Sequence, residues 1–225
     1  MKLGTFTTEV LKSFANINPN IVVRPGESVK TISQAKNVLA EFEPSEVFPQ
    51  EFGIYDLNEF LASVALVEDG ELDFNDGFVK VSNGKQTLKY FFSDPSILTT
   101  PAKGIAMPAA DLVLTISDEV LAQVRKAASV LGHSELAIVG DDTEVALTVM
   151  DAANGNATAS SFSIPVEAEE CGLSEFNFVL NIPNLKVIPG DYTVSISDKL
   201  ITSWDHTQFP VKYYIALENN STSSK

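Results

Sequence analysis

Hydrophobic positions repeat with a helical period between Phe52 and Val67, the clearest such stretch of the chain. Asp56 precedes the repeat as a helix N-cap, and Glu59 follows it by three residues, which is the spacing of a capping box. The apolar residues then recur at i, i+3, i+4 and i+7 and predict a helix with one buried face: Leu57, Phe60, Leu61 and Val64. We therefore expect this helix to pack on a sheet or a second helix and to leave a slim polar face exposed.

Three further segments have helical character, and the remaining apolar runs favour strands. The helical segments are Thr7–Ile17, Ser117–Leu131 and a short turn over Ile182–Lys186. The other runs are short, rich in β-branched and aromatic residues, and bounded by turn residues: Ile21–Val23, Val29–Ile32, Val38–Phe42, Phe52–Ile54, Glu71–Phe74, Phe78–Val81, Thr87–Phe92, Asp111–Ile116, Leu136–Val139, Glu144–Val149, Ser160–Val166, Glu175–Leu180, Tyr192–Ser197, Lys199–Ser203 and Phe209–Leu217. This mixture predicts an α+β fold.

The order of elements repeats in the second half of the chain. TTEVLKSFANI from Thr7 matches SDEVLAQVRKA from Ser117, and Lys89–Phe92 matches Lys212–Ile215. Asn177–Lys186 is a weaker copy of the helical stretch described first. These matches keep the same order and lie about 110 to 125 residues apart, which predicts a duplicated domain.

The boundary between the two domains is predicted from composition. Residues 93–108 contain three prolines and a glycine, and their apolar residues follow neither a helical nor a strand period. This composition is typical of a linker. We expect a first domain over 1–108 that includes this linker, and a second over 109–225 with a short disordered tail at 218–225. Two roles stay open for the apolar residues of the linker, packing on the sheets or bordering a partner groove: Ile97, Leu98, Ile105 and Met107.

The net charge of −15 is large for 225 residues and is unevenly shared. Residues 1–108 contain nine basic and fourteen acidic side chains, whereas residues 109–225 contain six and sixteen. By itself this balance argues against nucleic-acid binding, which depends on contacts with phosphate. Charges on an outer surface are screened over about 8–10 Å, however, so the placement of the few bases decides the question.

Residues that could form a catalytic or metal site are sparse. His133 and His206 lie at predicted surface positions far apart in the sequence, and the single Cys171 lies in an acidic loop, which disfavours a reactive thiolate. The acidic clusters Asp141-Asp142-Glu144 and Glu167-Glu169-Glu170 lack the spacing of a calcium loop and fit charged turns. No phosphate-binding glycine loop, zinc spacing or serine elbow is present. We expect a protein that is not an enzyme and needs no cofactor.

Five basic residues fall on or beside matching elements of the repeat: Lys2, Lys12, Arg125, Lys126 and Lys186. Each alone is compatible with an ordinary solubilising side chain. Together they indicate that many of the basic side chains of this acidic protein lie on or beside the predicted helices.

Motifs along nearly the whole chain resemble those of the sliding clamps of T4-like bacteriophages, which are DNA polymerase processivity factors. The resemblance rests on these segments: Met1–Leu3, Thr7-Thr8, Leu11-Lys12, Phe14-Ala15, Ile17-Asn18, Ile54–Leu61, Phe176–Phe178, Pro189–Tyr192 and Tyr213–Glu218. The motifs are structural and indicate no catalysis.

The resemblance implies a fold of duplicated clamp domains, each with antiparallel sheets outside and two helices facing a central hole, in a ring-forming subunit. It implies a homotrimer that encircles duplex DNA without sequence preference, so that its phosphate contacts need only be weak. The five bases named above then become candidates for facing DNA. Glu9 and Glu59 fit such a surface poorly.

The same resemblance implies protein partners. These are the C-terminal tail of the replicative DNA polymerase and an ATP-dependent clamp loader, in the cytoplasm of an infected bacterial host, with no membrane association. The polymerase tail would bind a groove for which the candidate residues are Leu98, Pro101, Ile105 and Tyr214.

Two other interpretations stay open at this point. A β-rich phage structural or assembly protein would use the duplicated sheets for protein contacts only. A hydrolase would depend on His133 or His206.

Overall fold

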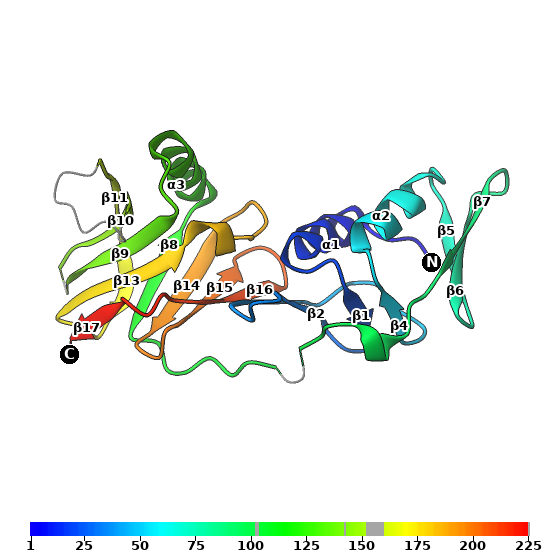
Figure 1. Ribbon diagram of the computed structural model, residues 1–225, viewed down its shortest axis with the longest axis horizontal. Coiled ribbons are helices and arrows are strands. Elements are labelled where there is room, and N and C mark those ends of the chain that lie inside the picture. The colour runs from blue at the N-terminus through cyan, green and yellow to red at the C-terminus, as the bar shows by residue number, and fades with distance from the viewer. Residues whose placement is uncertain (102–103, 142, 152–159, 225) are drawn as a thin grey trace. The chain divides into compact units, whose positions relative to one another are not determined.

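The computed structural model describes residues 1–101, 104–141, 143–151 and 160–224. The chain divides into two compact units, Met1–Gly104 and Ile105–Lys225, and the division falls inside the segment predicted as a linker. Each unit combines antiparallel sheets with helical segments (Figure 1). The α+β class predicted from the sequence is confirmed.

Unit 1, Met1–Gly104, contains two helices and two antiparallel sheets. The strand order is β3-β2-β1-β4 in one sheet and β5-β6-β7 in the other. The elements in chain order are α1 (Thr5–Ile17), β1 (Ile21–Val23), β2 (Val29–Ile32), β3 (Val38–Phe42), β4 (Phe52–Ile54), α2 (Leu57–Ala65), β5 (Glu71–Asn75), β6 (Phe78–Ser82), β7 (Thr87–Phe91) and the 3₁₀ turn η1 (Pro95–Ile97). These bounds follow the predicted ones closely.

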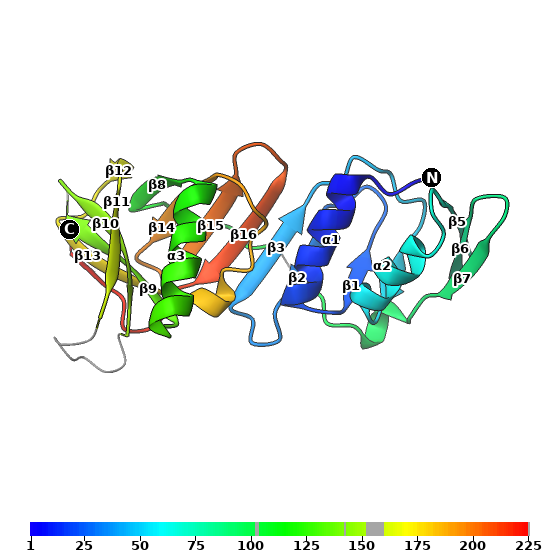
Figure 2. The ribbon, with the colours of Figure 1, turned by 90° about the horizontal axis from the view of Figure 1, so that it is seen from above.

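The two helices of unit 1 lie side by side over one face of the first sheet (Figure 2). Val10 and Phe14 of α1 and Leu57 and Phe60 of α2 are buried at the predicted apolar positions. Burial of each such side chain contributes about 1.5–3 kcal/mol. Because these faces are fixed against the sheet, the polar faces of both helices remain exposed.

Phenylalanine rings join the two sheets of unit 1. The ring centroid of Phe52 on β4 lies 5.1 Å from that of Phe74 on β5 and 5.0 Å from that of Phe92, which follows β7. Phe48 adds a fourth ring, 5.6 Å from Phe52. Contacts between aromatic rings at these distances stabilise a core beyond the area that they bury.

The described residues of unit 2, Ile105–Lys225, form two antiparallel sheets with five strands each. Their strand orders are β12-β8-β14-β15-β16 and β11-β10-β9-β13-β17. The elements in chain order are β8 (Leu112–Ile116), α3 (Asp118–Leu131), β9 (Glu135–Asp141), β10 (Val145–Met150), β11 (Phe162–Val166), β12 (Ala168–Cys171), β13 (Glu175–Asn181), the 3₁₀ turn η2 (Ile182–Asn184), β14 (Tyr192–Ser197), β15 (Ile201–His206), β16 (Val211–Ala216) and β17 (Thr222–Ser224).

Helix α3 begins and ends at the residues that the sequence predicts. Ser117 is its N-cap, with its hydroxyl oxygen accepting a hydrogen bond from the Val120 N–H at 3.3 Å. Gly132 ends it in the left-handed conformation, with φ of 70°. Leu121 and Val124 are buried against the strands below, which leaves the polar side of the helix exposed.

The second helical segment of unit 2 is a 3₁₀ turn, in keeping with the short turn predicted over Ile182–Lys186, whereas the family resemblance implied two helices per domain. In the described part of this unit α3 is the α-helix, and the second helical segment is η2, which spans Ile182–Asn184. Pro183 supplies no backbone N–H, and the chain continues without regular secondary structure through Ile188. The block of two helices is therefore complete only in unit 1.

Two segments predicted as irregular form edge strands instead. The acidic segment around Glu169 pairs with β8 as β12; charged residues are tolerated on such a solvated edge. The tail predicted as disordered over 218–225 contains β17, which pairs with Glu175–Asn177 of β13. Its polar residues satisfy the backbone groups of an edge that would otherwise be open.

The start of β15 also differs from the prediction of a strand over Lys199–Ser203. Leu200 adopts a φ of 60°, which places it in the turn between β14 and β15. The strand therefore runs from Ile201 to His206.

Candidate nucleic-acid interface

The exposed faces of the helices in unit 1 carry few charges. On α1, Lys12 is exposed together with Glu9 and Asn16. On α2, Asn58 and Glu59 are exposed. One base and two acids on neighbouring helices give a surface that is close to neutral and has no strong attraction for an anion.

The first turn of α2 confirms the predicted N-cap. A carboxylate oxygen of Asp56 accepts hydrogen bonds from the N–H groups of Asn58 and Glu59 at 3.0 and 3.1 Å. Burial, together with the carboxylates of Glu59 and Asp56, raises the pKa of Tyr90. Negative charge at this position is favoured by the partial positive charge of the helix N-terminus, which explains why a helix with few bases has acids here.

Helix α3 presents its two adjacent bases in different ways. Lys126 is exposed, whereas Arg125 is half-buried. The Arg125 Nη2 donates hydrogen bonds to the carbonyl oxygens of Leu185 and Val187, each at 3.2 Å. Arg125 thus donates to backbone carbonyls that follow η2, while Lys126 extends into solvent.

The remaining two predicted bases lie at the ends of elements. Lys186 follows η2 between the buried residues Leu185 and Val187 and is half-buried. Lys2 is exposed, with its Nζ 3.8 Å from a carboxylate oxygen of Asp69, a surface pair of small energetic weight. That these five bases face DNA stays a prediction.

The predicted groove residues divide between the two units. In unit 1, Leu98 is buried, and Pro101 lines a hollow of about 210 Å³ beside Arg24 and Lys30. A Cβ on Gly53 would lie 2.7 Å from the Ser93 backbone oxygen as well as 2.6 Å from Leu98 Cδ1, so glycine is required for this segment to cross β4. In unit 2, Ile105 is 37% exposed and Tyr214 is buried.

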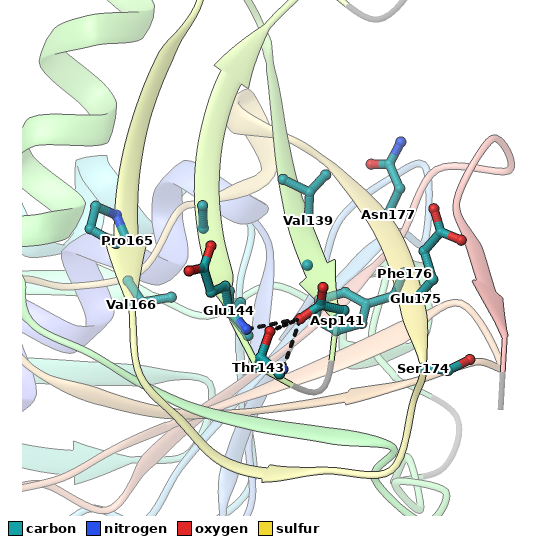
Figure 3. A pocket seen from close by; sticks show the side chains of 13 residues that line it. Val139, Asp141, Thr143, Glu144, Pro165, Val166, Ser174, Glu175, Phe176 and Asn177 are labelled. Atoms are coloured by element: carbon teal, nitrogen blue, oxygen red, sulfur yellow. Dashed lines mark hydrogen bonds between the residues drawn. The ribbon is translucent and has the colours of Figure 1, made fainter.

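A hollow of about 970 Å³ lies in unit 2 on the sheet that contains β9, β10, β11 and β13 (Figure 3). Asp141 accepts hydrogen bonds from the Thr143 hydroxyl at 2.6 Å and from the Glu144 N–H at 3.0 Å. These bonds hold the pKa of Asp141 below its ordinary value. The described lining contains no histidine, cysteine or lysine. The Asp141 carboxylate stabilises the turn of a hairpin through these bonds, which is a common role for aspartate.

The residues considered for a catalytic or metal site lie apart from one another. His206 was predicted at the surface but is buried, with its Nε2 3.2 Å from the Pro189 carbonyl oxygen and its ring packed on Tyr192. His133 lies 2.8 Å from the Ser160 carbonyl oxygen. Among the described residues no three His, Cys, Asp or Glu gather to hold a metal ion; Asp142 of the predicted acidic cluster lies outside them. None of the described helices is long and apolar enough to cross a membrane.

Sequence reasoning missed the contacts that hold the segment after η2. Asp118 at the start of α3 accepts a hydrogen bond from the Gly190 N–H at 3.0 Å, and its own N–H donates to Asp191 at 2.9 Å. The only signal was that Gly190 and Asp191 belong to a family motif. Their partner, Asp118, lies far away in the sequence, 72 residues before Gly190.

Comparisons with known proteins agree with the motifs. Residues 2–94 match the family described as DNA polymerase processivity factor, and residues 113–219 match the gp45 sliding clamp, C terminal. The chain is 31% identical to the sliding clamp of Enterobacteria phage T4 over 99% of both chains.

Solved structures show the same fold at low sequence identity. The proliferating cell nuclear antigen of Thermococcus kodakaraensis superposes with a TM-score of 0.69 at 14% identity, over 94% of this chain and 95% of that one. The Helicobacter pylori beta clamp bound to a DNA ligase peptide gives 0.65 at 11% identity, over 97% of this chain and 65% of that one. These findings favour the clamp over a β-rich structural protein. Because the identity to a phage clamp extends over the full length and both halves match clamp domain families, this chain belongs to the sliding clamps, the processivity factors of DNA polymerases.

Proposed function

We propose that this chain forms a homotrimeric ring around duplex DNA and tethers the replicative polymerase to it, without catalysing a reaction itself. The observation that carries the proposal is the duplication. Each unit combines antiparallel sheets with helical segments whose exposed sides are polar, apart from Val130 near the end of α3, and carry isolated lysines, such as Lys12 and Lys126. Helix faces of this kind would suit the inner surface of a ring.

In this proposal the contacts between the ring and DNA are weak. A closed ring cannot leave a duplex sideways, so it needs no strong phosphate binding, and each strong contact would slow its sliding. Lys2, Lys12, Lys126 and Lys186 supply the positive charge, and Glu9 and Glu59 limit the attraction. The excess of acidic residues would then lie mainly on the outer surface.

The edges of the sheets support ring formation. β7 is one edge of the three-stranded sheet in unit 1, and β11 is one edge of a five-stranded sheet in unit 2. Exposed edges are places where another chain can add a strand. Because the two edges are different surfaces, a contact between them would be heterologous, and heterologous contacts can close into rings.

The face of β6 and β7 near this edge supports the same contact. Phe91 is 67% exposed, and the Lys89 Nζ lies 3.6 Å from the ring centroid of Phe78. An exposed aromatic side chain of this size favours burial against a partner.

We propose the polymerase tail and an ATP-dependent clamp loader as partners. The candidate groove residues remain Leu98, Pro101, Ile105 and Tyr214. Support comes from the related beta clamp that was solved with a DNA ligase peptide, since one peptide-binding clamp makes a tail-binding clamp reasonable. The loader would supply the ATP hydrolysis.

The test is the mass of the purified protein at micromolar concentration, by sedimentation, combined with primer extension by the cognate polymerase and loader. We expect a trimer and long extension products. In an antiparallel pair every second residue of a strand is hydrogen-bonded to its neighbour. The Phe92 N–H donates to the Gly77 carbonyl on the β6 side. By this alternation the N–H of Lys89, three residues earlier, points away from β6. Lys89→Pro removes that donor and should lower the trimer fraction, whereas Lys80→Ala on the central strand should not.

A monomer at micromolar concentration that gives no stimulation of the polymerase would refute the proposal. A trimer fraction in Lys89→Pro equal to that of the wild type throughout a dilution series would place the subunit contact away from β7.

A further inference from the structure

The segment from η2 to β14 in unit 2 lies outside the α-helices and strand ladders that the structure describes. It begins with the single turn η2 and continues through Leu185, Lys186 and Val187 to β14. Buried backbone carbonyls outside a helix or ladder need other donors, since an unpaired one costs free energy. The way this segment is held therefore determines where Lys186 lies.

Apolar side chains and two tyrosines fix the far end of the segment. Leu185, Val187 and Ile188 are buried. The Tyr192 hydroxyl donates to the Ile188 carbonyl oxygen at 2.7 Å, and the Ile188 N–H donates to the Tyr213 hydroxyl at 3.3 Å. The segment thus has a folded conformation that does not depend on Arg125 alone.

Arg125 fixes the part that contains Lys186. Its Nη2 donates to the carbonyls on both sides of Lys186, those of Leu185 and Val187, at 3.2 Å each. Leu185 and Val187 are buried, whereas the Lys186 side chain between them is half-exposed. A single guanidinium group therefore holds the backbone on either side of a lysine that reaches the surface.

We infer that Arg125 is a positioning residue that holds Lys186 beside α3 for contact with DNA phosphate, and that Arg125 does not itself bind phosphate. The inference rests on the proposed function, because it needs DNA to pass this side of unit 2. It also corrects the role expected for Arg125 from the sequence. The Arg125 Nη2, which donates to both carbonyls, cannot turn toward DNA without breaking these two bonds.

The experiment measures binding of the full-length trimer to a linear duplex of about 30 base pairs, a length that covers several phosphate contacts, by fluorescence anisotropy across a series of salt concentrations. Lys186→Ala should weaken binding and reduce the salt slope by about one for each lost phosphate contact. Arg125→Met keeps the apolar stem without donors and should cause part or all of the same loss. The double variant should bind no more weakly than Lys186→Ala alone.

Two further variants separate positioning from simple destabilisation. Arg125→Lys retains one donor and should restore part of the affinity lost in Arg125→Met. Lys199→Ala, in the exposed turn before β15, is the matched charge control and should leave the salt slope unchanged. Hydrogen exchange should show faster exchange around Lys186 in Arg125→Met, with the core strands unaffected and the trimer mass unchanged.

The possible outcomes are distinct. Losses that multiply in the double variant would show that Arg125 contacts DNA itself, which overturns the inference. So would a Lys186→Ala variant with wild-type affinity and salt slope, in a ring that still stimulates the polymerase. If the wild-type trimer neither binds the duplex nor stimulates the polymerase, the proposed function fails and this inference fails with it.

Discussion

At the scale of single residues, Glu46 shows how a distant loop supplies what a helix sequence lacks. Helix α1 follows Gly4, which has no side chain to cap it. Glu46 Oε1 accepts from the Gly4 N–H at 2.5 Å, and Oε2 accepts from the Thr7 hydroxyl at 2.7 Å. Burial raises the pKa of Glu46, but these hydrogen bonds outweigh it, so that its pKa is lower than usual.

This geometry predicts a stability effect that depends on pH. Because the folded-state pKa of Glu46 is lowered, its contribution is present above the ordinary glutamate pKa and is lost as pH falls through the folded value. Glu46→Gln should cost about 1 kcal/mol at neutral pH, as for a lost helix cap, and the deficit should shrink in acid. Urea unfolding at several pH values measures it. Glu43→Gln, in the same loop, is the control; an equal deficit at every pH would contradict the prediction.

At the scale of elements, strand β17 ends the second sheet of unit 2 with polar residues. It pairs with Glu175–Asn177, and the Ser221 hydroxyl accepts from the Val179 N–H at 2.9 Å. Sequence composition alone favoured a disordered tail, because Ser, Thr and Asn carry little apolar surface. The strand forms because β13 offers an open ladder, which a short extended segment can complete.

Removal of residues 222–225 should uncover the edge of β13. We expect the amides of Glu175–Asn177 to exchange faster with solvent and the protein to self-associate more readily, because an open edge can pair with another chain. Hydrogen exchange and light scattering measure the two effects. Ser223→Ala keeps the backbone and should behave as wild type. Unchanged exchange in the truncated protein would show that β17 does not protect the edge.

At the scale of the whole molecule, a net charge of −15 coexists with a proposed DNA-binding surface. The two facts are compatible because charge acts locally, and the exposed bases Lys12 and Lys126 lie on helices. The acidic edge strand β12, around Glu169, lies on a sheet instead. Local separation of charge therefore decides binding, and the total charge does not.

The double variant Lys12→Ala/Lys126→Ala should retain the trimer and lose DNA contact. Its salt slope for a short duplex should fall by about two if each lysine contacts one phosphate, and polymerase processivity should fall with it. Salt titration by anisotropy, with sedimentation for the trimer, checks both expectations. Lys80→Ala/Lys199→Ala removes the same charge elsewhere; an equal fall in that protein would indicate a general charge effect.

The sequence by itself determined the helices, most strands, the duplication and the family, because these depend on periods and turn residues within a few positions of one another. Leu57 and Phe60 were assigned to a buried face by spacing alone, and the structure buries them. The same reasoning could identify Arg125 and Lys186 as basic residues on repeated elements. It could not assign them different roles.

Only the tertiary structure decided what those side chains contact. The cap on α1 joins residues with |i−j|=42, and Arg125 reaches carbonyls with |i−j|=60 and |i−j|=62. His206 is buried and β17 is ordered for the same reason, since both depend on strands that meet only in the folded sheet. Periodicity specifies which face of an element is apolar. The partner of a polar group is specified only when the chain has brought distant segments together and each buried donor and acceptor has to be satisfied.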